Sequence, residues 1–311
     1  KGHAVDTIAN GLGIAGCVSP VNYQMSWYQH PPYSTIKYLL GGGLAQQALA
    51  AAHLAEFGHQ GDTHILDDRE WGYPRFIGTT KWEPEHIIAG LGKNWLFPAV
   101  TSFKPYAHCR IMHASFDCIY GIVEEYDLSP DEIDGIKVYV EGFAEQPIWL
   151  NRAVTNPNDA QFSMAHGIAM AAHRPRTGRD WMDPTLIFSR SVLALMEKVT
   201  TEVHPDYVNL LTTQGASRPA WVEVRARGKR LVAERRFPKG SPSPESGTYM
   251  TDEELIAKFR ANTEGILTPA SIDLVIEAVM SLEKIDDVGS FMRLTGTAKS
   301  PVSPSPAEAA F

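Results

Sequence analysis

The sequence has 311 residues, enough for two domains, and its 44% hydrophobic and 21% charged residues are typical of a globular protein. Its formal charge of −8 argues against a nucleic-acid partner, because phosphate affinity depends on a surplus of Lys and Arg. Three scattered cysteines indicate neither a zinc knuckle nor a disulfide framework, and no apolar run is long enough for a membrane span, so we expect a cytoplasmic protein.

The amino-terminal part has the composition of a helical bundle. Small and apolar residues crowd 4–15 and 44–57, which predicts two closely packed helices. The first residue is Lys1 rather than Met, and a buried helix is predicted almost at once, so we expect further sequence in a longer precursor or on another chain. Three glycines at 41–43, before the second predicted helix, could bind an anion through free backbone N–H groups or could form only a tight turn.

The middle of the chain mixes helical and strand patterns. Residues 129–132 have the Ser-x-x-Glu spacing of a capping box, which predicts a short helical turn. Residues 136–140 alternate as a strand does, and 221–234 predicts a hairpin that turns around 227–229. Helices are predicted over three stretches: 104–126, 163–172, and 184–199 after Asp183.

A helical pattern resumes after a stretch rich in Pro, Ser and Gly at 238–247. Thr251 and Glu254 have capping-box spacing, and helices are predicted over 252–260 and from 268 or 269 to 282. We therefore predict a mixed α and α+β fold, in which an all-helical domain is interrupted by an α+β domain. The predicted boundaries are 1–100 and 245–296 for the helical domain, 101–244 for the α+β domain and 297–311 for a flexible tail.

Four stretches carry motifs whose order is informative. Near the start lie 12–16 (LGIAG) and 36–37 followed by 45–58, and later come 103–110 (FKPYAHCR) with His113, and then 237–240 (FPKG) with 250–259 (MTDEELIAKF). In this order they resemble the MmgE/PrpD family, which includes 2-methylcitrate dehydratase and cis-aconitate decarboxylase. The third stretch is similar to the K-P-Y-P-C-C-R-x-x-H segment that begins the family's lid domain.

The resemblance implies a cofactor-independent lyase that dehydrates, hydrates or decarboxylates a small carboxylic acid, with the α+β domain as its lid. Two departures matter. Leu40 stands where the family usually has a histidine, so one substrate contact is missing. Family members are longer, and their amino-terminal helical half carries an acidic residue and histidines on the far wall of the active site. We therefore expect a hetero-oligomer with a chain that supplies that half, and dimerisation through the family's interface.

Lys37, Lys104 and His113 match family residues and are the predicted catalytic groups. Removing a proton next to a carboxylate adds negative charge, so a nearby ammonium stabilises the transition state more than the ground state. A lysine without such a resemblance is usually a solvated surface residue. We predict that the three side chains surround one cleft between the domains.

Arg110, His108 and Tyr106 are the predicted substrate-binding residues. Arg110 could clamp a carboxylate or bridge the domains, His108 could be a structural histidine, and Tyr106 could serve in packing alone. His108 and His113 are five residues apart, which does not suit a metal pair of the i, i+4 kind. We expect no metal and no cofactor, and activity should survive chelation.

Two alternatives stay open beside the lyase. An isomerase or epimerase of a dicarboxylate would remove and return one proton with the same residues. A non-catalytic subunit would lend its lid and dimer surface to another chain that holds the complete site. A neighbouring chain that carries the absent helical half would distinguish these readings.

Overall fold

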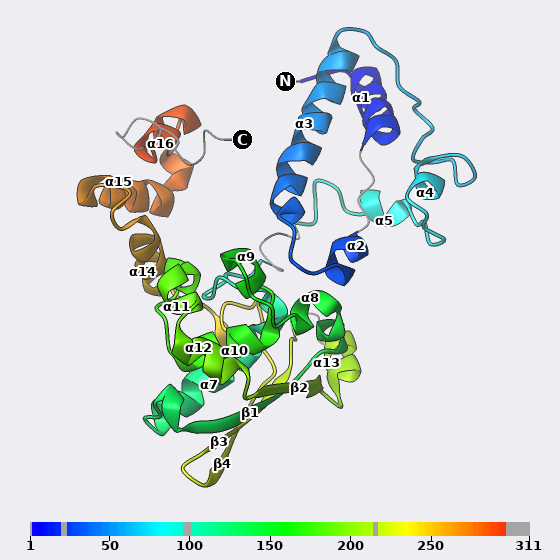
Figure 1. Cartoon of the computed structure of the whole chain (residues 1–311). Helices are drawn as coiled ribbons and strands as arrows, with labels where there is room; N and C mark the ends of the chain where they lie inside the picture. Colours follow the sequence, from blue (N-terminus) through cyan, green and yellow to red (C-terminus); the bar gives the residue numbers. More distant parts are fainter. Residues whose placement is uncertain (1, 20–23, 96, 98–100, 214–216, 297–311) are drawn as a thin grey trace, which may run out of the picture. The chain divides into compact units, whose positions relative to one another are not determined.

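The computed structural model describes residues 2–19, 24–95, 97, 101–213 and 217–296 (Figure 1). The chain divides into two compact units. The first consists of residues Lys1–Thr101 and Phe143–Met164, and the second of Ser102–Gly142 and Ala165–Phe311. Among the described residues, none of the helices is both long and apolar enough to cross a lipid bilayer.

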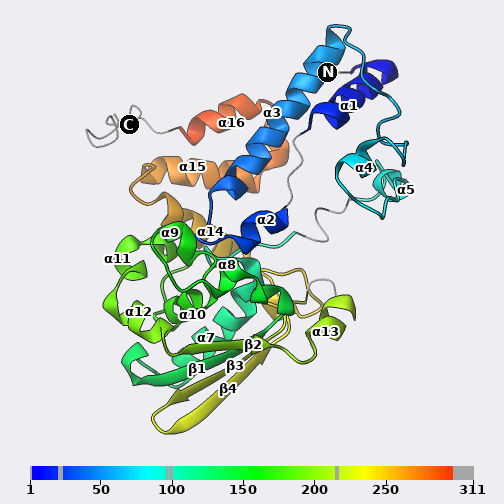
Figure 2. The ribbon, with the colours of Figure 1, turned by 45° about the vertical axis from the view of Figure 1, so that its right-hand side comes forward.

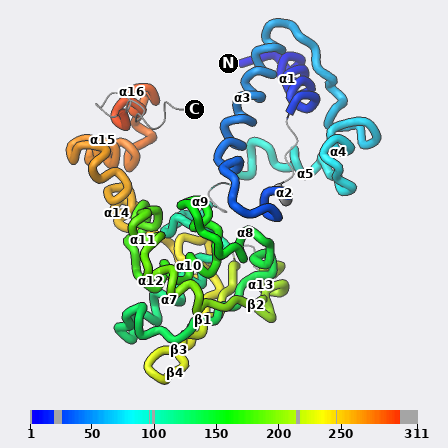
Figure 3. The backbone as a smooth tube through the Cα atoms, in the orientation of Figure 1, coloured from blue at the N-terminus to red at the C-terminus, as the bar shows by residue number. Residues whose placement is uncertain are grey.

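The first unit is built on two helices, α1 (Val5–Val18) and α3 (Ile36–Glu56), which pack side by side (Figure 3). Ile14 of α1 is buried with Ala51 and Ala55 of α3. Gly13 allows the backbone of Asp62 to approach α1, since a Cβ at this glycine would lie 2.6 Å from the Asp62 carbonyl oxygen. The shorter helices of this unit are α2 (Gln24–Gln29), α4 (Tyr73–Phe76), α5 (Glu85–Ile88), α8 (Pro147–Leu150) and α9 (Pro157–Ala160).

An aromatic cluster holds α2 and the loop after it against α8 and α9. The Tyr28 ring lies 4.9 Å from that of Trp149, and the Tyr33 ring stacks on Phe162 at 4.0 Å. The backbone N–H of Tyr33 donates to Asp159 over 3.0 Å. Because aromatic side chains bury large apolar areas, this cluster gives the unit a second core beside the α1–α3 pair.

One face of α1 is apolar and exposed. Val5, Ile8 and Leu12 are 79%, 51% and 55% exposed, and their spacing of three and four residues places them along one stripe of the helix. We call these three residues the α1 stripe. Three large apolar side chains in a row on a water-facing helix are a surface that normally packs against something.

The glycines at 41–43 lie inside α3, which begins at Ile36 rather than at residue 44. Their backbone N–H groups are therefore in the body of the helix, and the anion site considered for them is wrong. A Cβ at any of the three would meet nothing within 4 Å. The glycines thus leave a bare patch on the helix surface.

The second unit contains a four-stranded sheet with the order β2-β1-β3-β4 (Figure 2). Strand β1 (Ile133–Val140) pairs parallel with β2 (Val199–Val203) and antiparallel with β3 (Ala220–Ala226), which pairs antiparallel with β4 (Lys229–Arg235). Helix α7 (His113–Glu125) packs on β3 and β4. Alternate residues of β3 are buried, as expected for a sheet with one covered face.

The predicted hairpin is confirmed. Trp221 pairs with Glu234 and Val224 with Leu231, and the turn lies at Arg227 and Gly228, whose φ angles of 51° and 69° are both positive. The Arg227 guanidinium donates to both carboxylate oxygens of Glu132 at 2.7 Å and to the carbonyl oxygens of Tyr126 and Asp127 at 3.1 and 3.0 Å. The tip of the hairpin is thereby tied to the carboxyl end of α7.

The helix predicted over 184–199 is interrupted at 188–189 and ends earlier than predicted. It is two helices, α11 (Pro184–Ile187) and α12 (Arg190–Met196), and Val199 already begins β2. Asp183 caps the first helix as predicted, and the Ser189 hydroxyl accepts from the N–H of Val192 at 3.2 Å to begin the second. Two further helices are α10 (Met164–Ala172) and α13 (Tyr207–Thr213), and 3-10 turns lie at Arg110–Met112, Pro130–Glu132, Gly142–Glu145 and Arg179–Met182.

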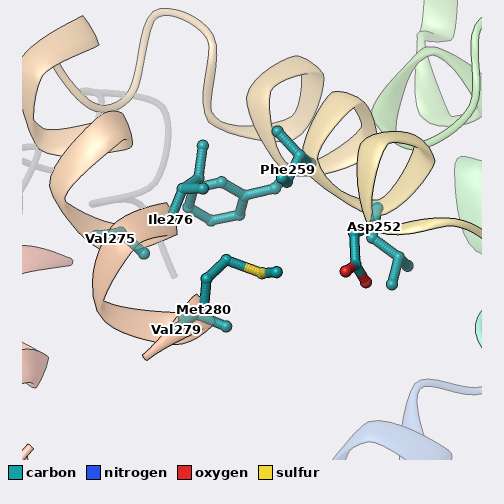
Figure 4. A pocket seen from close by; sticks show the side chains of 8 residues that line it. Asp252, Phe259, Val275, Ile276, Val279 and Met280 are labelled. Carbon is teal, nitrogen blue, oxygen red and sulfur yellow. The ribbon is translucent and has the colours of Figure 1, made fainter. Parts of the chain in front are cut away.

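The two predicted carboxyl-terminal helices are confirmed as α14 (Asp252–Thr263) and α15 (Pro269–Met280), and the Thr251 capping box is present. A third helix, α16 (Val288–Leu294), was not predicted. A hollow of about 200 Å³ between α14 and α15 is lined almost wholly by apolar side chains, among them Phe259, Ile276 and Met280 (Figure 4). Asp252 is its one charged lining residue, so the hollow suits packing better than chemistry. The predicted domain boundaries stay a prediction, and the tail at 297–311 lies outside the described residues.

Candidate functional site

The motif segment 103–109 runs as non-helical chain before α7 and is held by loops from elsewhere in the second unit. The N–H of Phe103 donates to the carbonyl of Gly240 at 2.9 Å, and the N–H of Gly178 donates to the carbonyl of Pro105 at 3.1 Å. These bonds fix the segment on both sides of Lys104. The predicted helix over 104–126 therefore begins only with the 3-10 turn at Arg110–Met112 and continues as α7.

Lys104 and His113 meet at one atom, the carbonyl oxygen of His108. The Lys104 Nζ and the His113 Nε2 each lie 3.2 Å from this oxygen. A carbonyl oxygen only accepts, so the His113 Nε2 carries the proton and its Nδ1 holds the lone pair. The structure thus brings together two of the three predicted catalytic groups.

His108 and His113 are both buried, at 4% and 1% exposed. The His108 ring packs edge-on to Phe116 at 4.9 Å, and the His113 ring lies 5.1 Å from Tyr106. Burial, followed by the charges of Lys104 and Arg110, holds the pKa of His113 well below 6.5, although the bond to the His108 carbonyl opposes this. His113 is therefore a neutral imidazole at neutral pH.

Tyr106 forms a buried clamp with Asp117. Its hydroxyl donates to one Asp117 carboxylate oxygen at 2.6 Å, and the backbone N–H of Lys239 donates to the other at 2.8 Å. Burial raises the pKa of Asp117 and also that of Tyr106. Because both carboxylate oxygens are occupied, the clamp joins α7 to the 237–240 motif, and Tyr106 has the surroundings of a packing residue. Its predicted role in substrate binding stays a prediction.

Arg110 joins a network of polar groups rather than standing alone. Its Nη2 donates to the Ser241 hydroxyl at 2.9 Å. Burial and the nearby charge of Arg218 lower the Arg110 pKa, while Glu141 opposes that change. Glu141 is only 3% exposed and accepts from Arg218 at 2.8 Å. Arg110 therefore links the start of α7 to the loop after the 237–240 motif, and its contact with a substrate stays a prediction.

Lys37 belongs to the first unit. It is the second residue of α3, and its Nζ lies 4.9 Å from the centroid of the Phe162 ring, in a cation–π contact. This contact explains how an ammonium is kept at the amino end of a helix, where the helix dipole disfavours it. The convergence of Lys37 with Lys104 and His113 stays a prediction.

Two polar residues of this region were not expected from the sequence. Asp117 lies four residues after His113 among the buried residues of α7, and a carboxylate between Phe116 and Cys118 was the signal that could have found it. Lys258 is part of the 250–259 motif and lines, with Lys104 and Arg179, a cavity of about 290 Å³. No acidic side chain is among the residues that line this cavity within the described chain. Such a cavity can attract a small anion.

Across the residues that the structure describes, no three His, Cys, Asp or Glu side chains come together in a way that could hold a metal ion.

Comparison with protein-family models identifies a related family. The family model of the MmgE/PrpD C-terminal domain matches residues 106–282, which is more than half of the chain. The matched part begins within the motif segment and includes the sheet, α7, α14 and α15. None of the curated proteins matches the chain.

Proposed function

This chain belongs to the MmgE/PrpD family through its carboxyl-terminal domain, and on that premise we propose that it serves a lyase reaction on a small carboxylic acid. Dehydration or hydration is the first candidate and decarboxylation the second. The observation that carries the proposal is the meeting of the Lys104 ammonium and the neutral His113 imidazole at the His108 carbonyl oxygen.

In this proposal Lys104 is the residue that contacts the substrate. Its ammonium would neutralise the carboxylate next to the carbon that loses a proton, where charge builds up in the transition state. Lys104 also lines the cavity of about 290 Å³, so a small acid can approach it. This is the preferential stabilisation that a lyase without a metal requires.

His113 would act as the neutral partner of Lys104. A protonated imidazole would repel the ammonium, whereas a neutral one shares the His108 oxygen with it. With 1% of His113 exposed, proton transfer through its Nδ1 would require the ring to become accessible. The remaining acid or base is proposed to come from a second chain.

Exposed apolar side chains on α1 and α3 support the proposal of a second chain. Besides the α1 stripe, Leu39, Leu49 and Phe57 at or near α3 are 63%, 63% and 82% exposed. A helical segment laid over these side chains would remove them from water, at about 25 cal/mol per Å² of apolar area buried. We propose a hetero-oligomer in which that partner supplies the amino-terminal helical half.

The function is tested by assaying the chain, alone and co-expressed with such a partner, on di- and tricarboxylates. Lys104→Met should lower kcat by about 10²–10³-fold, the usual effect of removing one charge-stabilising donor. Lys284→Met, at an exposed lysine of the same unit, is the matched control and should leave kcat unchanged. Unaltered turnover by Lys104→Met would contradict the proposed role.

Light scattering tests the assembly. We expect the isolated chain to aggregate and the co-expressed pair to form a defined particle with turnover. A soluble homo-oligomer of this chain alone, with full activity, would refute the second chain while leaving the lyase proposal intact.

A further inference from the structure

The cavity beside Lys104 has an unusual set of lining residues. Three of them carry positive charge, namely Lys104, Lys258 and Arg179, and the others are Tyr106, Ala107, Gly178 and Asn262. Its volume of about 290 Å³ is at the small end of ligand pockets. A cavity of this size and charge suits a small anion rather than a nucleotide or an apolar ligand.

Lys258 lies on α14 and is half-buried. Its Nζ donates to the carbonyl oxygen of Lys104 at 2.6 Å, and within the described chain it has no carboxylate partner. An ammonium has three N–H donors, so two remain for another acceptor. Burial lowers the Lys258 pKa and no acidic neighbour offsets this, so the protein keeps this cation here at a cost.

Arg179 and Asn262 are oriented by each other. The backbone N–H of Arg179 donates to the Asn262 Oδ1 at 2.9 Å, which leaves the Asn262 Nδ2 as a donor without a described partner. The Arg179 guanidinium donates to the carbonyl of Glu264 at 2.6 Å and lies 3.7 Å from the Glu264 carboxylate. Glu264 is also 3.7 Å from Arg176, whose guanidinium donates to Asp180 at 2.7 Å.

Gly178 allows the backbone at Arg179 to lie close to the Asn262 side chain. Its φ of +97° is in the region that favours glycine, and a Cβ there would collide with the Asn262 side chain. The backbone next to Arg179 can therefore approach α14 only because residue 178 lacks a side chain. The polar groups around the cavity are thus positioned by specific contacts.

We propose that Lys258, together with Arg179 and the Asn262 amide, binds a carboxylate group of a small anion in the cavity that Lys104 also lines. Lys258 donates to the carboxylate with its two remaining N–H groups, and the Asn262 Nδ2 adds a neutral donor. The inference rests on the proposed function only in taking the anion to be the substrate. Lys258 is then a substrate-binding residue, which holds one carboxylate while Lys104 faces the reacting one.

Binding is tested by calorimetry on the full chain, in its complex with the partner if the complex is what purifies. The probe is succinate, and its neutral control is succinamide. A charge-assisted hydrogen bond predicts that Lys258→Gln weakens succinate binding by about tenfold or more. Lys258→Arg should retain most of the affinity, and Lys284→Gln, a matched change at an exposed lysine, should bind as the unaltered chain does.

Several outcomes overturn the site: no succinate binding, equal binding of succinamide, or unchanged affinity in Lys258→Gln. Unfolding midpoints of the variants show whether each is folded, and Lys258→Gln should be at least as stable as the unaltered chain because it removes a poorly solvated charge. If the protein turns over an acid and Lys258→Gln leaves KM unchanged, the carboxylate site is contradicted and the proposed lyase activity is not. If succinate binds through Lys258 and no acid is turned over, the proposed lyase activity is contradicted and the carboxylate site is not.

Discussion

His113 shows how one buried side chain couples this site to pH. Its folded-state pKa lies below 6.5, so in the window between the two values the unfolded chain binds more protons than the folded one. Stability should therefore fall as the pH drops below about 6.5. His166, whose pKa is also lowered by burial, acts in the same direction. Asp117 opposes them at more acid pH, because its raised pKa makes the folded state bind a proton first.

We predict that the free energy of unfolding falls by roughly 1–2 kcal/mol between pH 7 and pH 5 through His113. His113→Gln should flatten this dependence, because glutamine does not titrate. Urea unfolding at several pH values provides the measurement, and equal slopes for His113→Gln and the unaltered chain would show that His113 is not a neutral buried imidazole.

Removing the Tyr106 hydroxyl distinguishes a structural role of this residue from a role in substrate binding. Tyr106→Phe removes the donor to Asp117 and leaves one buried carboxylate oxygen without its partner, which should cost about 1–3 kcal/mol of stability. The same variant should leave KM nearly unchanged in the active assembly. Tyr249→Phe, at a half-exposed tyrosine that donates to the carbonyl of Ser243, is the control. A raised KM without loss of stability would make Tyr106 a substrate residue.

At the scale of elements, the same substitution should have opposite effects on stability at Gly42 of α3 and at Gly13 of α1. Gly42→Ala should raise the stability of the isolated chain by about 1 kcal/mol, because alanine favours the helix and its Cβ meets nothing within 4 Å. Gly13→Ala in α1 should destabilise it, because the added Cβ would lie 2.6 Å from the Asp62 carbonyl oxygen.

Thermal unfolding of the two variants measures the contrast. If Gly42→Ala stabilises the isolated chain and weakens association with a partner, the bare patch is a packing surface. A loss of stability in Gly42→Ala alone would mean that α3 is not helical at this position.

Elements whose signals are local could be predicted from the sequence. The hairpin turns where Gly228 permits it, and α14 begins at Thr251 because Thr and Glu have capping-box spacing. By contrast, β2 was missed, since the sequence VTTEV has little alternation and the strand forms only by pairing with β1. The glycines at 41–43 led to the wrong prediction that the helix begins after them. Residues 36–40 and 44–56 on either side favour the helix and outweigh the low helix propensity of the three glycines.

The candidate site shows the same difference between local sequence signals and long-range contacts. Lys104 and His113 could be predicted from motif resemblance, but their meeting at the His108 carbonyl depends on the backbone path of 104–112. The contact of Asp117 with Lys239 and that of Lys258 with Lys104 each join residues that are distant in sequence. No local pattern predicts these two contacts. The sequence therefore predicts which side chains carry chemistry better than it predicts which of them are neighbours.

For the molecule as a whole, the α1 stripe predicts how the chain behaves in solution. Ile8→Glu should make the isolated chain more soluble, because it breaks an exposed apolar row with a charge. The same change should abolish assembly with a helical partner. Gln60→Glu, a polar-to-charged change at an exposed residue of the same unit, tests whether charge alone is responsible. Light scattering and co-purification measure both effects, and assembly that survives Ile8→Glu would place the partner surface elsewhere.

The tether made by Arg227 bears on how this protein can be engineered. The tip of a two-residue hairpin is ordinarily a convenient place for an epitope, a fluorophore or new chain ends, since such tips tolerate insertion. Here the tip residue is bound to Glu132 and to the carbonyls of Tyr126 and Asp127. An insertion between Arg227 and Gly228 would detach the hairpin from α7, the helix that begins with His113. A tag at this turn would therefore report on a perturbed protein, and a label elsewhere on the surface is the better choice.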